Sequence, residues 1–570
     1  MTGALLLTLV LSAPVASQPV TIDAYLERYF KTFPSRASFA GRHEFDHQLE
    51  DLSAERRAGW VEFNKTAVAS FREQLAKQEP GSDTALDLEA VLRHAERQVF
   101  SWETLQQPER NPLFWTGLIA SSTVFLIVRD DAPEEERLRG AASRARLLPR
   151  LAKQAQEALG GTDPTTITKE LCEIAARQVR GSAQFYAEGF GRAASPELAE
   201  LNGELAGAGK KASPALNEFA DFLEKLAEKA SGSPRLGEHY AESFRLGTGL
   251  EESVDDVLAR AEAALAEKRA EVADYGRFAW MRLFPYDDAP EDDKELIRKL
   301  FERIGQDHAD STEEFVEDYR QLVAESVDFV RRKDVITLPD PLTVWIDRSP
   351  SFFVGQSVGG VYPAGPYAPD ADTLLYLPTP PDHFSDEMRA AFFRDFNDHF
   401  NKMITPHEIV PGHYLQAKLA AHHPRKVRAL FSDGVYVEGW GTFCERLILD
   451  LGWGGPMERL AHLKKQLENI ARTIVDIRVH TRGMTQEEMV TFVQEDAFQD
   501  ALFADNMWRR AITTSPQLTT YFLGYTEIWS LFEDVKAARG ESFVLREFND
   551  GLMELGPVAV RHYRARMLAP

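Results

Sequence analysis

The segment Pro406-His407-Glu408-Ile409-Val410-Pro411-Gly412-His413 decides how this chain is interpreted. In the H-E-x-x-H helix of zinc hydrolases, two histidines four residues apart lie on one helix face and bind Zn²⁺. The adjacent glutamate acts on a water molecule. Here the second histidine follows the first by six positions, about 240° around an undistorted helix. A zinc site therefore requires the backbone between the two histidines to leave the helical path.

Pro411-Gly412 can take the backbone off the helical path in either of two ways. Proline removes a hydrogen bond of the helical ladder and glycine accepts unusual dihedral angles. The pair could bulge out of one helix and return His413 to the face of His407. Alternatively, it ends one helix, and His413 begins another. These eight residues alone do not choose between the two.

A second pattern, Glu438-Gly439-Trp440-Gly441-Thr442-Phe443-Cys444-Glu445, follows downstream. A seven-residue interval is about two helical turns, so Glu438 and Glu445 share a helix face. Zinc hydrolases with two histidine ligands often take a third ligand from a following helix. A further carboxylate can accept the remaining ring N–H of a ligand histidine. We assign Glu438 as a ligand and Glu445 as that acceptor; the alternative is two solvated glutamates.

Together these motifs resemble a bacterial family, domain of unknown function 885, which is generally taken to consist of gluzincin-type zinc metallopeptidases. A more distant similarity is to dipeptidyl peptidase III. The resemblance is strong over about 400–560. Further positions match the family's downstream patterns: Asp476, His480, Gly483, Arg510, Gln517, Tyr521 and Gly524.

The resemblance implies a zinc-dependent hydrolase, most specifically a metallopeptidase with one Zn²⁺ per chain. The ligands would be His407, His413 and Glu438, with Glu408 as general base. It also implies that three further side chains stabilise the developing oxyanion: Tyr521, His480 and Arg510. Each of these three has an ordinary structural alternative, as a buried tyrosine, a core histidine or an ion-paired arginine.

Two other functions stay open at this stage. The substrate could be a non-peptide amide or a specialised metabolite rather than a peptide, since fold and metal chemistry do not fix the substrate. The chain could also be a non-catalytic binding protein with a vestigial metal site. One departure from the family bears on how a substrate would bind. Pro378 stands where the family has asparagine after a strand that docks the peptide, so the usual peptide-docking strand is not expected here.

Composition excludes several classes of partner. The chain has 570 residues, 44% of them hydrophobic, which is enough for a large core. Its formal net charge of −24 argues against nucleic acid and anionic membranes as partners. The resemblance implies a peptide or small amide as substrate. Cys172 and Cys444 are its only cysteines, so neither a disulfide framework nor a thiolate zinc site is expected.

The N-terminus resembles a secretory signal. An apolar run, 4–11, precedes the small residues of 12–17, so we predict a signal peptide over 1–17 and export to the periplasm or outside the cell. It is too short for a confident membrane span, and no span is expected after its removal. No cysteine follows it, so a lipid anchor is not expected. The alternative is a cytoplasmic protein with an unstructured or buried N-terminus.

The remaining pattern predicts a mainly α chain with a small β-sheet next to the active-site helix, and the resemblance implies a two-lobed architecture of the metallopeptidase kind. Apolar residues at helical spacing predict a helical region over 18–334, clearest at 215–230, 251–274 and 292–332. The region 335–570 would hold the zinc site. Its short β-branched runs predict strands at 335–338, 343–346 and 374–377.

One rival motif is the nucleophile elbow of serine hydrolases, G-x-S-x-G, which Gly355-Gln356-Ser357-Val358-Gly359 fits. The elbow requires a helix immediately after the serine. The residues that follow are rich in glycine and proline and favour a loop, so we interpret the segment as a loop beside the substrate site.

Overall fold

A computed structural model describes residues 19–340, 342, 344–348, 360–380 and 384–568. The chain is mainly helical with one small sheet, which confirms the predicted mainly α class with a small β-sheet. The predicted signal peptide lies outside the described residues.

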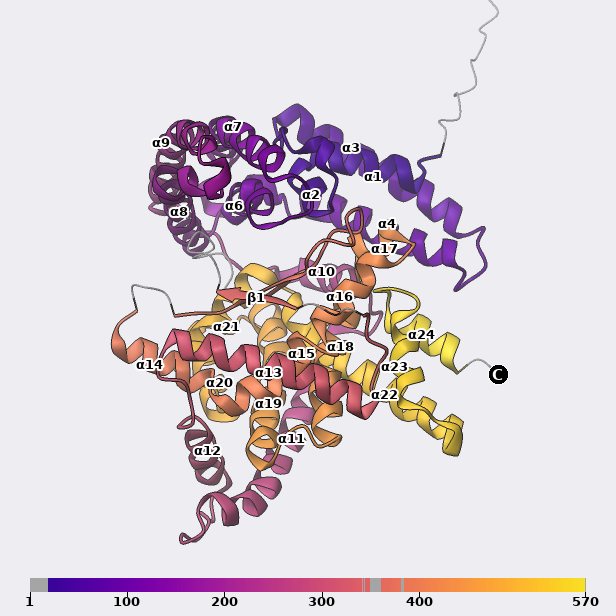
Figure 1. The fold of residues 1–570 in the computed structure, drawn as a ribbon. Helices are drawn as coiled ribbons and strands as arrows, with labels where there is room; N and C mark the ends of the chain where they lie inside the picture. The colour runs from indigo at the N-terminus through magenta and orange to yellow at the C-terminus, as the bar shows by residue number, and fades with distance from the viewer. Residues whose placement is uncertain (1–18, 341, 343, 349–359, 381–383, 569–570) are drawn as a thin grey trace, which may run out of the picture.

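The N-terminal helices form one tier of the molecule, at the top of Figure 1. They share a hydrophobic core to which Trp60, Trp115 and Phe219 contribute fully buried side chains. Their bounds are α1 Ile22–Thr32, α2 Pro34–Phe39, α3 Ala54–Leu75, α4 Asp83–Val99, α5 Gln107–Arg110, α6 Pro112–Val128, α7 Glu134–Gly160, α8 Lys169–Gln184 and α9 Leu201–Ala227.

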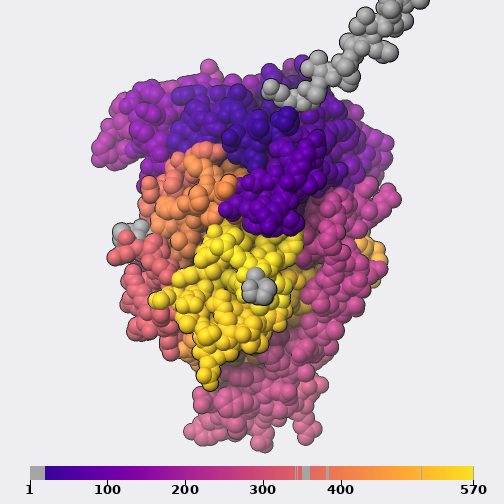
Figure 2. Space-filling view, turned by 90° about the vertical axis from the view of Figure 1, so that its right-hand side faces the viewer, coloured from indigo at the N-terminus to yellow at the C-terminus, as the bar shows by residue number. Residues whose placement is uncertain are grey.

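The second tier holds the remaining helices and, with them, both sequence motifs (Figure 1). In the space-filling view its C-terminal surface lies between the N-terminal tier and the tip formed by residues near 280 (Figure 2). Its helices are α10 Tyr240–Thr248, α11 Val254–Leu283, α12 Asp293–Ile304, α13 Thr312–Lys333, α14 Asp386–Asp395, α15 Asp398–Glu408, α16 His413–His422, α17 Lys426–Leu430, α18 Gly434–Asp450, α19 Pro456–Thr481, α20 Gln486–Asp496, α21 Ala501–Thr514, α22 Thr520–Arg539, α23 Leu545–Met553 and α24 Val560–Met567.

The two cores divide the chain before residue 240. Helices α10 to α13 lie within the predicted helical region 18–334, yet their buried residues belong to the same core as α15, α18 and α19. That predicted region therefore contributes to both tiers. In return, Val427 at α17 is buried in the core of the N-terminal tier.

Local signals set the ends of the long helices. Ser253 caps α11 by accepting a hydrogen bond from the Asp256 N–H, and Ser311 caps α13 through Glu314 in the same way. The predicted helix 292–332 is wrong in one respect: it is two helices, because α12 ends before Gly305 and Ser311 starts α13.

A three-stranded sheet lies between the tiers, in the order β1 (Trp345–Arg348), β3 (Leu374–Leu377), β2 (Gly360–Tyr362). The central strand β3 runs parallel to β1 and antiparallel to β2. Leu374 and Tyr376 pack with Val124 of α6, whereas Leu375 and Leu377 belong to the core of the second tier. Alternation along β3 thus joins the two tiers through one strand.

The strand predictions have mixed outcomes. The strand at 374–377 is confirmed, and β1 overlaps the one predicted at 343–346. The strand at 374–377, β3, is the central strand and is paired on both sides. It therefore has no open edge at which a peptide could dock, whatever residue follows it. The strand β2 was not predicted.

The strand predicted at 335–338 is wrong. The Thr337 backbone N–H donates to Asp550 Oδ1 at 2.8 Å, and the Val335 carbonyl accepts from the Asn549 side chain at 2.8 Å. These contacts with α23 occupy backbone groups that a sheet would use. β-branched residues fit this irregular, partly buried segment as well as they fit a strand. Composition alone therefore could not distinguish the two.

The rival serine motif at 355–359 lies outside the described residues. Gly360–Tyr362, which follow it directly, form β2 rather than a helix. The helix that a nucleophile elbow requires does not begin there.

Candidate metal centre

The two histidines of the opening motif lie on different helices. α15 ends at Glu408, one residue after His407, and α16 begins at His413. The two imidazole rings nevertheless meet, with centroids 4.6 Å apart and ring planes at 84°. The sequence offered a bulge or a helix end as alternatives. The structure has the helix end, and the turn at 409–412 still returns His413 to His407.

Glycine at 412 makes this turn sterically feasible. A Cβ atom there would lie 1.8 Å from the carbonyl oxygen of His407 and 2.3 Å from that of Pro406. No side chain fits in that space, so the backbone at 412 packs directly on the last turn of α15. Trp440 holds the turn from the other side, because its indole N–H donates to the Pro411 carbonyl at 2.8 Å.

Helix α18 supplies both carboxylates and lies against His407. Asp433 caps its start by accepting a hydrogen bond from the Tyr436 N–H. A Cβ at Gly441 would lie 2.8 Å from His407 Cε1, so the glycine lets the ring rest on the helix. A Cβ at Gly439 would meet Gly524 of α22 at 2.4 Å. The glycines of the Glu-Gly-Trp-Gly motif therefore bring α18 close to α22 and to the first histidine.

Ligand atoms of His407, His413 and Glu438 all lie within 4.8 Å of one another, and no other such group occurs among the described residues. Glu438 Oε2 lies 3.4 Å from His413 Nε2 and 3.8 Å from His407 Nε2. The side chains of His413 and Glu438 retain 15% and 19% of their exposure, so the group is open on one side.

Glu445 fixes the orientation of His407. Its carboxylate is fully buried, and Oε1 lies 2.7 Å from His407 Nδ1. A carboxylate only accepts hydrogen bonds, so Nδ1 carries the proton and Nε2 presents its lone pair toward Glu438. Burial, with the neighbouring His413, lowers the pKa of His407 to about 3, which leaves the ring neutral at physiological pH.

The His413 and Glu438 pair behaves differently. Although burial opposes it, the contact with Glu438 raises the pKa of His413 to about 9. The same contact lowers the pKa of Glu438 to about 2, again against burial. Because a metal ion requires the unprotonated imidazole, it competes with this proton for His413 Nε2.

These donors fit a zinc ion. Two imidazole nitrogens and one carboxylate oxygen are a common protein ligand set for catalytic Zn²⁺. The Glu445 contact to Nδ1 is the outer hydrogen bond that metal-bound histidines usually make. Mn²⁺ and Co²⁺ accept the same donors, with affinities set by their place in the divalent series.

Glu408 lies at the end of α15, and its charge acts on both His407 and His413. The structure thus places the predicted base beside the predicted ligands.

A polar network joins two other predicted residues, Tyr521 and Arg510, to the ligand Glu438. Gln517 Nε2 donates to Glu438 Oε1 at 3.2 Å and to the Tyr521 hydroxyl oxygen at 3.0 Å. Arg510 donates to Gln517 Oε1 at 2.5 Å and to the Tyr521 oxygen at 3.1 Å. Arginine only donates, so the amide oxygen of Gln517 faces Arg510 and its NH₂ faces Glu438 and Tyr521.

The structure does not bring His480 into this group. His480 Nδ1 accepts from the Leu236 N–H at 3.1 Å, and Nε2 donates to the Ala511 carbonyl at 2.9 Å. Its ring also stacks on Tyr240 with centroids 5.3 Å apart. Both nitrogens are occupied by backbone groups, so the predicted role of His480 at the oxyanion gives way to a structural one.

Four residues around this network were not among the predicted site residues: Lys465, Glu468, Arg472 and Gln517. Three of them are buried charged residues on α19, at intervals of three and four. That spacing is a sequence signal for a polar face on a helix. Gln517 had matched a family pattern without a chemical assignment.

Comparisons with known proteins agree with the fold. The family described as bacterial protein of unknown function (DUF885) matches residues 34–567. A candidate lipoprotein of unknown function from Shewanella oneidensis has a similar structure, with TM-score 0.76 and 25% identity, covering 96% of this chain and 98% of that one. A candidate lipoprotein from Colwellia psychrerythraea aligns with TM-score 0.75 and 17% identity, over 95% and 96% of the chains. No curated protein matches.

No helix within the described part of the chain is both long enough and apolar enough to span a membrane.

Proposed function

Because the chain belongs to the bacterial DUF885 family and gathers His407, His413 and Glu438 into one group, we propose that it is a zinc-dependent hydrolase. Within that class we propose a metallopeptidase that cleaves peptide bonds with water. The observation that carries the proposal is the convergence of three ligand atoms within 4.8 Å, with Glu445 bound behind His407.

The three side chains would hold one Zn²⁺ and leave room for water and substrate. A zinc ion there would supply Lewis-acid chemistry and make a water molecule more acidic. The neutral His407, held in one tautomer by Glu445, is oriented for this role before any metal binds.

Glu408 would act as general base. Its carboxylate accepts a proton from the attacking water and later transfers it to the leaving amine, so one group serves both halves of the hydrolysis. The end of α15 at Glu408 and the action of its charge on both histidines support this role.

Tyr521 would donate to the developing oxyanion. Its oxygen already accepts hydrogen bonds from Gln517 and Arg510. Its own proton has no acceptor in the contacts of the described residues, and it is therefore free to point at substrate. A positioned donor of this kind is aimed at the charge that forms in the transition state. Arg510 would hold the tyrosine in place through its hydrogen bond to the hydroxyl oxygen.

Metal content tests the first half of the proposal. We expect about one zinc per chain in the purified protein by elemental analysis, and none in His413→Ala. An Arg509→Ala variant, altered at an exposed residue of α21, should retain the metal. Zinc absent from the wild-type protein after zinc is supplied contradicts the proposal.

A substrate screen tests the second half. We expect the zinc-loaded protein to hydrolyse short peptides and its Glu408→Gln variant to be inactive. If zinc is bound but only non-peptide amides are cleaved, the substrate class changes and the chemistry stands.

Export is part of the proposal. The two similar structures are described as candidate lipoproteins, which supports a location outside the cytoplasm for this chain as well. Cell fractionation of the full-length protein beside a variant lacking residues 1–17 tests it. Equal distribution of the two forms would contradict export through this segment.

A further inference from the structure

A histidine that the proposed hydrolysis does not use lies behind the metal centre, against Glu445. His462 of α19 exposes 3% of its surface and stands in the core of the second tier, between the buried Ala461 and Leu463. Its Nδ1 lies 3.3 Å from Glu445 Oε2, while the other oxygen of that carboxylate lies 2.7 Å from His407 Nδ1. One fully buried carboxylate therefore joins His462 to a proposed zinc ligand.

The two facing atoms have no other partner. Glu445 Oε2 and His462 Nδ1 are both buried, and neither forms a hydrogen bond with any group in the part of the chain that the structure describes. At 3.3 Å the pair is long and imperfectly aligned for a hydrogen bond, so the attraction is between an N–H dipole and a carboxylate charge. Without this donor, a buried carboxylate oxygen would keep the full cost of its desolvation.

The tautomer of His462 follows from this contact. Burial lowers the pKa of His462 below its usual 6.5, although the contact with Glu445 opposes the shift. The ring is therefore neutral at physiological pH and carries one proton. A carboxylate only accepts hydrogen bonds, so that proton belongs on Nδ1, where it faces Glu445.

A second donor restricts how the Glu445 carboxylate can turn. The last torsion of a glutamate side chain is broad, so the contact with His407 alone leaves the carboxylate free to rotate. The N–H of His462 acts on the other oxygen and limits that rotation. The charge of Lys465 also attracts Glu445, but its Nζ donates to Glu468 at 3.1 Å. The orientation of Glu445 therefore depends on the two histidines.

We propose that His462 is a positioning residue of the metal centre, which acts through Glu445 to hold His407 with Nε2 presented to a metal ion. The inference rests on the proposed function and adds a member to its site. Groups that orient a metal ligand from outside typically change metal affinity by about 10- to 100-fold. A core histidine that served packing alone would affect stability and leave metal binding unchanged.

Zinc affinity tests this role. We expect His462→Leu to weaken zinc binding by about 10-fold in competition with a chelator. His462→Asn should bind zinc nearly as the wild type does, because the asparagine NH₂ replaces the Nδ1–H donor. Unchanged zinc affinity in His462→Leu overturns the inference.

The matched control for this test is His480→Leu. It removes a histidine of the same helix with the same 3% exposure, whose two ring nitrogens meet backbone groups. This variant should lose stability and keep its zinc affinity. An equal loss of zinc affinity in His480→Leu and His462→Leu would mean that any buried histidine of α19 has this effect, and the inference would fall.

A double-mutant cycle shows whether His462 acts through Glu445. In a Glu445→Ala background, His462→Leu should cause no further loss of zinc affinity, because the group that it positions is already gone. Losses that add in full would mean that His462 affects the metal centre by another route, which contradicts the inference.

A measurement on the metal-free protein separates this inference from the proposed function. In protein labelled with ¹⁵N-histidine, the Nδ1–H signal of His407 is identified by its loss in His407→Gln. We expect this proton to exchange with water about 5-fold faster in His462→Leu, and at the wild-type rate in His462→Asn. Faster exchange supports the inference even if no peptide is hydrolysed. Equal exchange in wild type and His462→Leu overturns it, even if the protein is an active zinc peptidase.

Discussion

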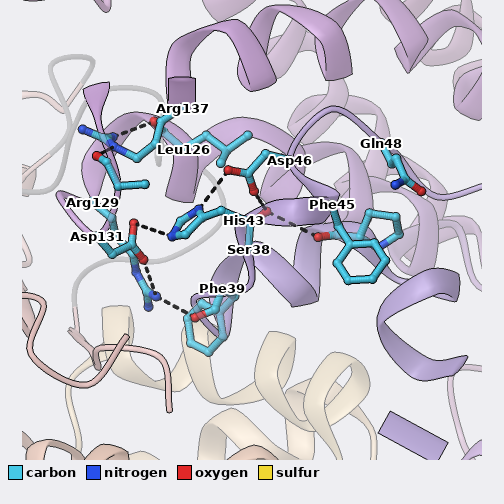
Figure 3. A network of polar contacts seen from close by, with 12 residues as sticks. Ser38, Phe39, His43, Phe45, Asp46, Gln48, Leu126, Arg129, Asp131 and Arg137 are labelled. Carbon is cyan, nitrogen blue, oxygen red and sulfur yellow. Dashed lines mark hydrogen bonds and ion pairs between the residues drawn. The ribbon is translucent and has the colours of Figure 1, made fainter. Parts of the chain in front are cut away.

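The regions around His407 and around His43 each place a histidine against carboxylates, and of these two only the His407 region forms a candidate metal site. In the second tier, His407 contacts Glu445 and faces Glu438 and His413. In the N-terminal tier, His43 lies between Asp46 and Asp131, next to Arg129 and Arg137 (Figure 3). We refer to these last five residues as the His43 network.

The difference lies in what the second ring nitrogen meets. His43 Nδ1 lies 2.9 Å from Asp46 and Nε2 lies 3.5 Å from Asp131, so carboxylates occupy both sides of the ring. The hydrogen bond that His43 donates to Asp46 raises the pKa of His43, although burial opposes it. The Nε2 atom of His407 lies 3.8 Å from a Glu438 oxygen that is closer still to the second imidazole, His413, and burial lowers the pKa of His407 to about 3.

A carboxylate beside a histidine does not by itself define a metal site. A protonated histidine between two carboxylates forms ion pairs, whereas a neutral histidine with a second imidazole nearby can offer a lone pair to a metal ion. The His43 network also joins parts of the fold, since Arg129 donates to the carbonyls of Phe39 and Pro363. It connects the N-terminal tier to the segment that follows β2.

The largest expected effect is on catalysis, which should depend on the His407 region and not on the His43 network. Glu408→Gln should lower kcat/KM by about 1000-fold, because the base is lost, while zinc content stays the same. His43→Gln should leave kcat/KM unchanged. Peptide hydrolysis and elemental analysis of the same preparations measure both. Full activity in Glu408→Gln would show that another group takes the proton.

A second substitution tests the turn that brings the two histidines together. Gly412→Ala should displace His413 and abolish zinc binding, because its Cβ would lie 1.8 Å from the His407 carbonyl oxygen. Gly434→Ala, whose Cβ would meet only ordinary contacts near 3.8 Å, is the control. Zinc titration of both proteins measures the effect, and normal binding by Gly412→Ala would contradict the geometry.

The third test removes the buried charge of the His43 network. Asp131→Ala should destabilise the protein by about 3 kcal/mol, because His43 and the buried Arg129 lose their shared carboxylate. Zinc affinity should not change. Urea unfolding followed by circular dichroism measures the loss, with Asp288→Ala, at an exposed position between α11 and α12, as control. An unchanged unfolding midpoint would mean that the His43 network contributes nothing to the free energy of unfolding.

The fourth test compares the carboxylates bound to each histidine. Glu445→Ala should weaken zinc binding by about 10- to 100-fold, since His407 loses the acceptor that orients it. Asp46→Ala removes the equivalent partner of His43 and should leave zinc affinity unchanged. Competition with a zinc chelator measures both. Glu445→Gln, which keeps an accepting oxygen, should fall between wild type and Glu445→Ala.

The smallest expected effect concerns pH. The pKa of His43 is raised above its usual 6.5 in the folded protein, so its protonated form stabilises the fold. That contribution is complete below pH 6.5 and is lost as pH rises through the folded pKa. The stability difference between wild type and His43→Gln should therefore shrink by about 1 kcal/mol or less at alkaline pH. A difference that grows with pH would contradict this sign.

Local patterns account for much of the site. The H-E-x-x-P-G-H and Glu-Gly-Trp-Gly motifs named His407, His413, Glu438 and Glu445, which the structure brings together. They could not show that α15 ends at Glu408, because proline and glycine suit a bulge and a helix end equally well. Nor could they exclude His480, whose partners come from segments distant in sequence.

The sequence by itself determined the helical class, the family and the residue types of the metal centre, because these depend on spacing and on side-chain chemistry within short segments. Only the tertiary structure decided which charged groups meet. Lys465, Arg472 and Arg510 become neighbours through the packing of α19 and α21, and His43 meets Asp131 across separate segments. Burial and electrostatic contact depend on these long-range approaches, and they set the protonation of each histidine.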